Sequence, residues 1–562
     1  MSLLKKHSLL QFLLVAVFNL FAFNAAAQSD PSGERRVTGT YVITNATVFT
    51  GTGPGATLDI IIKNGLIEAV GKNLKPPLDA QEIKGDSLFV YPGFIDVAGN
   101  AGVKTPAAPE RPVNMDPSDP PPHIAGITPY VDVLNSWEPS AEDLDTWRKT
   151  GITMVNLIPN GEGMLPGKTA TVLAGHKGSS NILASSTGMF AKFEAIRGLY
   201  PGTTLGVMAK WRELYQNAEL AQKHQSLFAS NKGIVRPEKD LVLEAFFPVI
   251  DQAVPVIFKI SDELELRRAL SLQREKGFKV IITGINEGAS LIPIIKEAKA
   301  QVVLSANLPE DKASKKEIKG ASEEVKANLE RVQAAYKNSL ELASVFEKEG
   351  IPFAYGTLDL QKGDLLKNIR LMVENGLSEE AALAALTINA ARILGQDQFT
   401  GTIEKGKLAN LVITTDSLFK SESEVKQVFV DGYIFNYETN KKSKGNDEKA
   451  TDITGTWSYN TETPQGSSTG EMTIKKESEG YSGTITFDNP AGGGTKTADM
   501  SGIKQSGTSF EFQFNVDVQG MALSVTVSGD FSEDNYQGKM SITDFGSFPF
   551  TATKTPDSNT NN

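Results

Sequence analysis

Short runs of hydrophobic residues, separated by polar and turn-forming residues, fill the stretch of residues 41–91. Such a pattern predicts β-strands. Two of the runs, Leu58–Ile62 and Leu66–Val70, flank Asn64-Gly65, and an Asn-Gly pair between apolar runs is a strong signal for a β-hairpin. So small a sheet cannot bury its hydrophobic face alone. Strand patterns that are candidates for its partner occur far downstream, at residues 401–413 and 425–435.

Apolar, strand-like runs alternate with amphipathic helical runs between these two stretches. This alternation predicts a parallel α/β fold. One predicted helix has a clear start, because Ser378 can cap it and Glu379-Glu380 place acids in its first turn. The expected strands are residues 151–158, 254–260, 279–283, 301–305 and 351–356. The expected helices are residues 142–149, 262–276, 289–300, 317–349, 364–375 and 378–394.

The pattern changes after a polar, lysine-rich stretch that predicts a linker at residues 438–451. About eight short β-patterned runs follow within residues 452–556, separated by Gly, Asn, Asp and Ser. Their even spacing predicts a separate all-β domain, either an up-and-down barrel or a sandwich. Its start, Gly455-Thr456-Trp457, is similar to the Gly-x-Trp start of lipocalin-like barrels.

The N-terminus has the order of a secretory signal peptide. Lys5-Lys6 precede an apolar run from Leu9 to Phe23, and Ala25–Ala27 offers a small-residue cleavage site. We therefore expect residues 1–27 to be removed, and the mature protein to be periplasmic or secreted and without a membrane span. Loss of Lys5 and Lys6, with no acid, takes the net charge from −11 to −13. So acidic a chain is a poor partner for nucleic acids, and without cysteine it forms no disulfide.

The stretch Phe89–Gly102 organises the centre of the chain. Pro92-Gly93 ends one strand, and Phe94-Ile95 begins another that we expect to be buried on both faces. With Asp96, this stretch resembles the entry to the first barrel strand of the amidohydrolase superfamily, whose pattern is Pro-Gly-hydrophobic-Ile-Asp-x-His-x-His. Two further segments resemble the same superfamily: Gly401–Ile413, similar to Gly-x-Ile-x-x-Gly-Lys-x-Ala-Asp-Leu-Val, and the helix of residues 376–395.

The resemblance covers residues 41–437 and is nearest to imidazolonepropionase-like members. It implies an α/β fold in which residues 94–395 form a TIM-like (β/α)8 barrel. Beside the barrel, residues 41–93 and 396–437 are expected to form a small composite β-sandwich. The resemblance also implies hydrolysis of a non-peptide carbon–nitrogen bond, such as that of a cyclic amide, in a small-molecule substrate. The superfamily uses a divalent metal such as zinc to activate water.

The residues that would hold this metal are replaced here. Ala98 and Asn100 stand at the two histidine positions after strand one, and Lys259 stands at the histidine position after strand five. After strand eight, Asp359 comes one residue later than the usual aspartate. We therefore predict no metal or other cofactor, although carboxylates alone would suit magnesium or calcium. The mature chain keeps three histidines, none at a ligand position: His123, His176 and His224.

Chemistry without a metal would rely on the residues left at the mouth of the barrel. The candidate catalytic residues are Lys259, Glu287 and Asp359, with Lys259 as acid/base or electrostatic stabiliser. An ion pair that fills the place of the metal is the structural alternative. The residues expected to contact substrate are Asn100, Tyr355 and Thr357. Two functions stay open: an exported hydrolase, and a catalytically inactive relative that binds a ligand or a partner.

Overall fold

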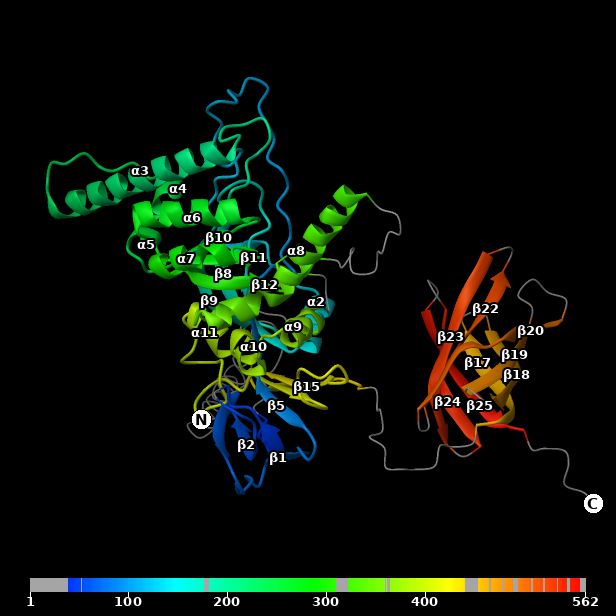
Figure 1. Ribbon diagram of the computed structural model, residues 1–562. Coiled ribbons are helices and arrows are strands. Elements are labelled where there is room, and N and C mark those ends of the chain that lie inside the picture. Colours follow the sequence, from blue (N-terminus) through cyan, green and yellow to red (C-terminus); the bar gives the residue numbers. More distant parts are fainter. Residues whose placement is uncertain are drawn as a thin grey trace, which may run out of the picture. The chain divides into compact units, whose positions relative to one another are not determined.

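The computed structural model describes most of residues 39–555 (Figure 1). The gaps within that range are residues 52, 176–180, 310–321, 359, 361–363, 440–452, 464–465, 478–479, 489–493, 507–508, 519–520, 533 and 543–545. The chain divides into two compact units, residues 1–439 and 440–562. The predicted signal peptide and nearly all of the predicted linker lie outside the described residues. No helix in the described part of the chain is long and apolar enough to cross a membrane.

The first unit is built around an eight-stranded sheet with the order β13-β12-β11-β10-β9-β8-β7-β6. The sheet curls into a barrel that is nearly closed. The Leu358 N–H, two residues beyond the edge strand β13, donates to the carbonyl of Ala98 in the other edge strand, β6, at 2.8 Å. The strands are β6 (Phe94–Gly99), β7 (Ile152–Leu157), β8 (Gly167–Leu173), β9 (Ile182–Lys192), β10 (Val256–Lys259), β11 (Val280–Ile285), β12 (Gln301–Ser305) and β13 (Phe353–Gly356).

The third strand, β8, departs from the expected all-parallel barrel. It pairs antiparallel with both β7 and β9, whereas the other neighbours in the sheet are parallel. The reason lies in the connection: residues 158–166 join β7 to β8, and a parallel crossover needs a dozen residues or more. The coarse prediction of an α/β barrel is therefore confirmed, and the regular (β/α)8 alternation was wrong at this strand.

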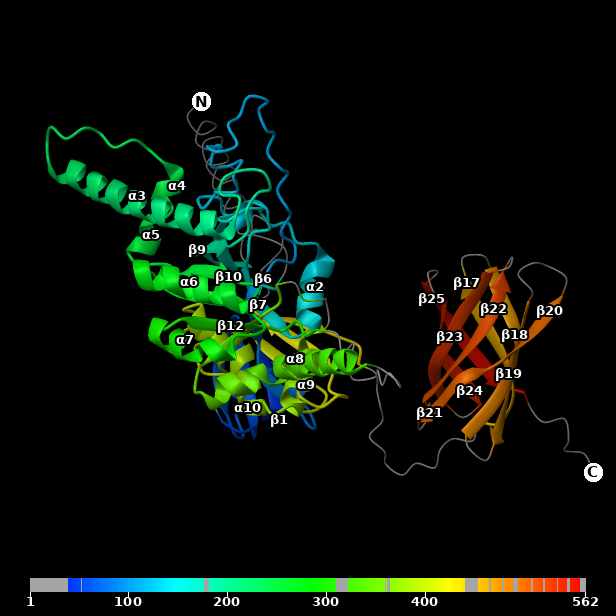
Figure 2. The ribbon, with the colours of Figure 1, turned by 45° about the horizontal axis from the view of Figure 1, so that its top comes forward.

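Helices cover the outside of the barrel, as Figures 1 and 2 show for α6, α7 and α8. Asp262 caps α6 by accepting a 2.7 Å hydrogen bond from the Glu265 N–H, and Gly277 ends it in the left-handed conformation. The α-helices are α2 (Ala141–Lys149), α3 (Thr204–Ser230), α4 (Leu241–Glu244), α5 (Phe247–Ile250), α6 (Glu263–Lys276), α7 (Ile292–Ala298), α8 (Glu323–Lys348), α9 (Leu365–Glu374), α10 (Glu379–Leu386) and α11 (Ile388–Ile393). Two short 3-10 helices are η1 (Val133–Asn135) and η3 (Ala289–Leu291).

Side chains along the barrel strands alternate between the helix layer and the barrel interior. On β10, Val256 and Phe258 pack in the large cluster with the helices, whereas Ile257 belongs to a second cluster inside the barrel. On β9, Ala191 faces the helices and Phe190 faces the interior. The inward-facing apolar residues fill the part of the barrel below its C-terminal mouth. Polar side chains at the next inward-facing positions, two residues further along the strands, reach the mouth.

A second sheet joins the two ends of the first unit, and Figure 1 shows the blue strands β1, β2 and β5 beside the yellow β15. Its order is β16-β15-β14-β5-β1-β2-β3, with β4 paired to β1. The antiparallel pair β14–β5 links Leu411 to Pro92 directly before the barrel begins. The strands are β1 (Tyr41–Val48), β2 (Ala56–Lys63), β3 (Leu66–Gly71), β4 (Gln81–Lys84), β5 (Phe89–Pro92), β14 (Leu411–Thr414), β15 (Val425–Val430) and β16 (Tyr433–Asn436).

The second unit is an all-β sheet with the order β20-β19-β18-β17-β25-β24-β23-β22-β21. The two edge strands, β20 and β21, are separated only by Met500, so one continuous segment pairs with β19 through its first half and with β22 through its second half. Buried aromatic side chains such as Trp457, Phe510 and Tyr536 fill the interior. The strands are β17 (Gly455–Thr463), β18 (Gly466–Glu477), β19 (Gly480–Asp488), β20 (Thr495–Asp499), β21 (Ser501–Ser506), β22 (Ser509–Val518), β23 (Met521–Ser532), β24 (Asn535–Ile542) and β25 (Gly546–Lys554).

Candidate site at the mouth of the barrel

Asp96 joins the first and last strands of the barrel at the C-terminal end. Its Oδ1 accepts hydrogen bonds of 3.0 Å from the N–H groups of Ala98 and Thr357, and its Oδ2 accepts one from the Thr357 hydroxyl. Gly99 permits this arrangement, because a Cβ there would lie 2.3 Å from the Asp96 Oδ2. We refer to the Asp96–Thr357 contact as the barrel clasp. Thr357, a predicted substrate-binding residue, therefore uses its hydroxyl in the clasp.

The Asp96 carboxyl is buried, with only 2% of the residue exposed. Burial penalises its charged form and raises its pKa to about 6, although the hydrogen bonds from Thr357 and Ala98 lower the pKa in the opposite direction. A carboxyl with this pKa changes charge in a mildly acidic solution. The strength of the clasp is therefore expected to depend on pH.

Asn100 lies just beyond β6, at the second of the two positions where the superfamily pattern has histidine. Its Nδ2 donates to Asn160 Oδ1 at 2.8 Å, and Asn160 Nδ2 donates to the Val103 carbonyl at 2.6 Å. Asn100 and Thr357 both line a small cavity of about 150 Å³ beside the clasp. The structure thus brings together two of the predicted substrate-binding residues.

Lys259 ends β10 two residues after the inward-facing Ile257, so it points to the barrel interior and is partly buried. Its register partners are Thr283 on β11 and Lys192 on β9. Lys192 follows the inward-facing Phe190 by two residues and pairs with Glu194 at 2.5 Å. The mouth therefore carries two lysines side by side, and Lys192 was not among the predicted site residues.

Two other predicted residues lie elsewhere. Glu287 is exposed beyond β11, where its Oε1 accepts a 2.9 Å hydrogen bond from the Glu263 N–H at the start of α6. Tyr355 faces the helices, and its hydroxyl donates to the Met372 sulfur at 3.4 Å. Burial, with a smaller contribution from the negative charge of Glu347, raises the pKa of Tyr355 well above its usual range. Asp359 lies outside the described residues.

The side chains that the structure describes at the mouth do not fit a transition metal. The two positions where the superfamily has histidine ligands on β6 carry the methyl group of Ala98 and the amide of Asn100, and ammonium groups are not ligands while protonated. Within the described residues, no group of three His, Asp or Glu side chains is placed to hold a metal ion. His123 is exposed, and the imidazole of His224, in α3, contacts the carbonyl of Val235, a residue that follows this helix, at 2.9 Å.

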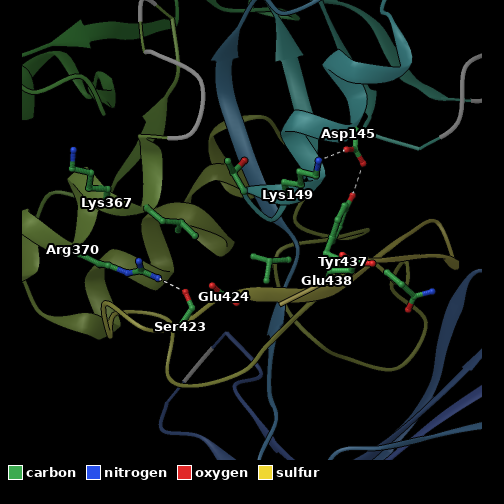
Figure 3. A pocket seen from close by; sticks show the side chains of 12 residues that line it. Asp145, Lys149, Lys367, Arg370, Ser423, Glu424, Tyr437 and Glu438 are labelled. Carbon is green, nitrogen blue, oxygen red and sulfur yellow. Dashed lines mark hydrogen bonds and ion pairs between the residues drawn. The ribbon is translucent and has the colours of Figure 1, made fainter. Parts of the chain in front are cut away.

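A larger pocket, of about 700 Å³, lies between α2, α9 and the strands β15 and β16 (Figure 3). Several of its polar groups have partners within the chain. Asp145 accepts from Lys149 at 2.9 Å and from the Tyr437 hydroxyl at 3.0 Å, and Arg370 donates to the carbonyls of Leu418 and Ser423. The pocket lies at the N-terminal end of the barrel strands, since Lys149 and Thr150, which line it, come just before the start of β7 at Ile152. We assign it to the packing of the barrel on the second sheet, and not to catalysis.

Comparison with known proteins gives the class of fold. The Amidohydrolase family matches residues 321–435, which run from α8 to β16. Among solved structures, an amidohydrolase from Thermotoga maritima is 22% identical with a TM-score of 0.58, and the match covers 71% of this chain and 100% of that one. No curated protein sequence matches the chain.

Two further solved structures match at lower similarity. An Xaa-Pro dipeptidase with bound methionine is 16% identical with a TM-score of 0.42, over 71% of this chain and all of that one. An N-acyl-D-glutamate deacylase from Bordetella bronchiseptica, complexed with zinc and a phosphonate inhibitor, is 15% identical with a TM-score of 0.38, over 72% of this chain and 98% of that one. The family match and the fold shared with the Thermotoga maritima protein confirm the resemblance to the amidohydrolase superfamily.

Proposed function

We propose that this protein is an exported hydrolase that cleaves a non-peptide carbon–nitrogen bond, of the cyclic amide type, in a small molecule. The reaction would take place at the barrel mouth without a metal. The observation that carries the proposal is the inward-facing ammonium group of Lys259 at the C-terminal end of β10 in an amidohydrolase fold. In barrels of this kind the reacting groups lie at this end of the strands.

Lys259 is proposed to stabilise the charge that develops on the carbonyl oxygen when water attacks the amide carbon. A cationic donor aimed at that oxygen replaces the polarising effect that a metal gives elsewhere. Asn100 and Thr357 line one small cavity beside the barrel clasp, and they are proposed to contact the substrate there. Tyr355 is left out of this role, because its ring packs in the helix layer.

A substrate screen of the purified mature chain tests the proposal. The panel contains a hydantoin, a dihydropyrimidine, a lactam and an N-acyl amino acid, each assayed for release of an amine or a carboxylic acid. We expect turnover of at least one compound in the presence of a chelator. Replacement of one oxyanion donor lowers kcat by about 10²–10³-fold, so Lys259→Ala is expected to lose that much activity.

The matched control is Lys296→Ala, since Lys296 lies on the surface of α7 and pairs with Glu349 at 2.8 Å. This variant should retain full activity. Failure of the wild type to hydrolyse any member, with or without added zinc or manganese, would favour the second function, a non-catalytic ligand-binding protein. Activity that depends strictly on added metal would contradict the proposed role of Lys259.

A further inference from the structure

The pocket between α2, α9 and the strands β15 and β16 has room for a small molecule, with a volume of about 700 Å³ (Figure 3). On its α2 side, Lys149 and the Tyr437 hydroxyl both contact the Asp145 carboxylate, at 2.9 and 3.0 Å. These three groups hold α2 to the second sheet. The other charged groups of the lining come from α9 and from the ends of the two strands, and they decide which ligand the pocket can hold.

The helix α9 contributes two cations to this pocket. Lys367 and Arg370 are three residues apart and therefore lie on the same face of the helix. The Nε and Nη2 groups of Arg370 donate to the carbonyls of Leu418 and Ser423, at 3.0–3.1 Å, and the negative charge of Glu422 raises the pKa of Arg370 against the lowering effect of burial. Among the described residues, the Arg370 Nη1 group has no hydrogen-bond acceptor and Lys367 forms no ion pair. Both cations therefore have donors left for a ligand carboxylate.

The strand side of the pocket contributes acids. Glu424 directly precedes β15 and already has an interaction within the chain, whereas Glu438, shortly after β16, is exposed. Figure 3 shows Glu438 on the opposite side of the pocket from Lys367 and Arg370. These acids repel a ligand that carries only negative charge, and the two cations repel a ligand that carries only positive charge. A ligand with an anionic end and a cationic end is attracted by both sides.

We propose that this pocket binds a zwitterionic ω-amino acid, with its carboxylate on Lys367 and Arg370 and its ammonium group near Glu438. The alkyl chain of such a ligand would separate the two charges, as the opposite positions of these residues require. Leu366 and Val425, which also line the pocket, would contact that chain.

The proposed reaction yields a compound of this class. Hydrolysis of a lactam breaks the ring carbon–nitrogen bond, places the hydroxyl of water on the carbonyl carbon and its hydrogen on the nitrogen. The acid then transfers its proton to the amine, so one molecule carries a carboxylate and an ammonium group at its two ends. The pocket would thus hold product at the end of the barrel opposite to the mouth. This link to the product rests on the proposed function, whereas the binding step stands independently of it.

Calorimetric titration of the purified protein with non-hydrolysable probes tests the binding step. The probes are 6-aminohexanoate, hexanoate and hexylamine at fixed ionic strength, which share one alkyl chain and differ in their charged ends. We expect 6-aminohexanoate to bind, and the two singly charged probes to bind about tenfold more weakly or less, because each lacks one ionic contact. Lys367→Met and Glu438→Gln should each weaken 6-aminohexanoate binding about tenfold. Lys296→Met, the surface control, should leave the affinity unchanged. Both site residues are exposed, so the variants should match the wild type in thermal unfolding.

The Lys259→Ala variant separates this pocket from the barrel mouth. It should lose hydrolysis and keep the wild-type affinity for 6-aminohexanoate. Binding of 6-aminohexanoate that is weakened in Lys367→Met and Glu438→Gln supports the inference, even if no amide in the substrate screen is hydrolysed. The inference is overturned if 6-aminohexanoate does not bind, if hexanoate binds equally well, or if either pocket variant keeps the wild-type affinity. Loss of binding in Lys259→Ala would place the ligand at the mouth and would also overturn it.

Discussion

At the scale of single residues, the barrel clasp is the most specific feature of the structure. Asp96 combines deep burial with three hydrogen bonds from Ala98 and Thr357. It holds the end of β6 to the residues that follow β13, and so closes the barrel directly below the mouth. Its pKa of about 6 lies above the ordinary value of 3.8. The folded state therefore binds this proton more tightly than the unfolded chain does.

We predict that Asp96→Asn removes one component of the pH dependence of stability. A raised carboxyl pKa stabilises the fold fully below about pH 4 and loses that contribution as the pH rises through about 6. The shift corresponds to about 3 kcal/mol. Asparagine can still accept from the two N–H groups and cannot titrate. Urea unfolding between pH 4 and 7 should show a free energy of unfolding that falls more steeply in the wild type than in Asp96→Asn.

The exposed control for this measurement is Asp119→Asn, which should follow the wild type across the pH range. If the free energy of unfolding changes equally with pH in the wild type and in Asp96→Asn, the Asp96 carboxyl does not titrate with a raised pKa, and the prediction is wrong.

Some of these residues are recognisable from the sequence and others are not, for physical reasons. Asn100 and Lys259 stood out because the superfamily pattern places histidines there. Lys192 was missed because Ser185-Ser186-Thr187-Gly188 interrupts the apolar pattern of β9, and Ser186 adopts a left-handed conformation. Tyr355 points outward because side chains alternate between the two faces along β13. This direction can be derived from the sequence only when the strand boundaries are known.

At the scale of elements, some segments were predicted closely, whereas the longest helix in the described part of the chain, α3 (Thr204–Ser230), was not among the expected helices. The helix expected at residues 262–276 is α6, Glu263–Lys276, and the strand expected at 301–305 is β12. The antiparallel direction of β8 was not anticipated, because periodicity indicates a strand and carries no information on its direction. Only the length of the connection from β7 limits that direction.

The start of α10 gives a prediction at this scale. Ser378 Oγ accepts a 3.1 Å hydrogen bond from the Ala381 N–H and donates to Glu347, which links α10 to α8. We predict that Ser378→Ala lowers the free energy of unfolding by about 1–2 kcal/mol, the usual cost of losing such a cap. Chemical denaturation measures the change. Ser226→Ala, inside the exposed part of α3, is the control and should shift stability by less than about 0.5 kcal/mol. An equal effect of the two substitutions would contradict the capping role.

At the scale of the whole molecule, the chain consists of an amidohydrolase-type unit and an all-β unit with separate hydrophobic cores. Composition and strand spacing indicated the second unit. The continuous segment through Met500, which pairs with strands on both sides, is visible only in the structure.

We predict that residues 452–556 fold without the rest of the chain. Their buried side chains, Trp457 and Phe531 among them, contact one another within the same unit. A protein fragment of these residues should give a cooperative thermal transition with a near-ultraviolet circular dichroism signal from Trp457. A fragment without such a transition would mean that the first unit is needed to complete the fold.

Export gives a second prediction at this scale. The only small-residue cleavage site of the predicted signal peptide ends at Ala27, so we expect the mature chain to begin near Gln28. N-terminal sequencing of the protein from a periplasmic or culture fraction measures the start. An intact Met1 in that fraction would refute the predicted cleavage.

The metal content of the purified full-length protein tests the central claim most directly, because the proposed chemistry replaces the metal of the superfamily with Lys259. Inductively coupled plasma mass spectrometry, after purification without chelators, measures bound metal against protein concentration. We predict far less than one equivalent of zinc, manganese, iron and nickel combined, and unchanged hydrolysis after dialysis against a chelator. One or more tightly bound equivalents per chain, lost together with activity on chelation, would contradict the account.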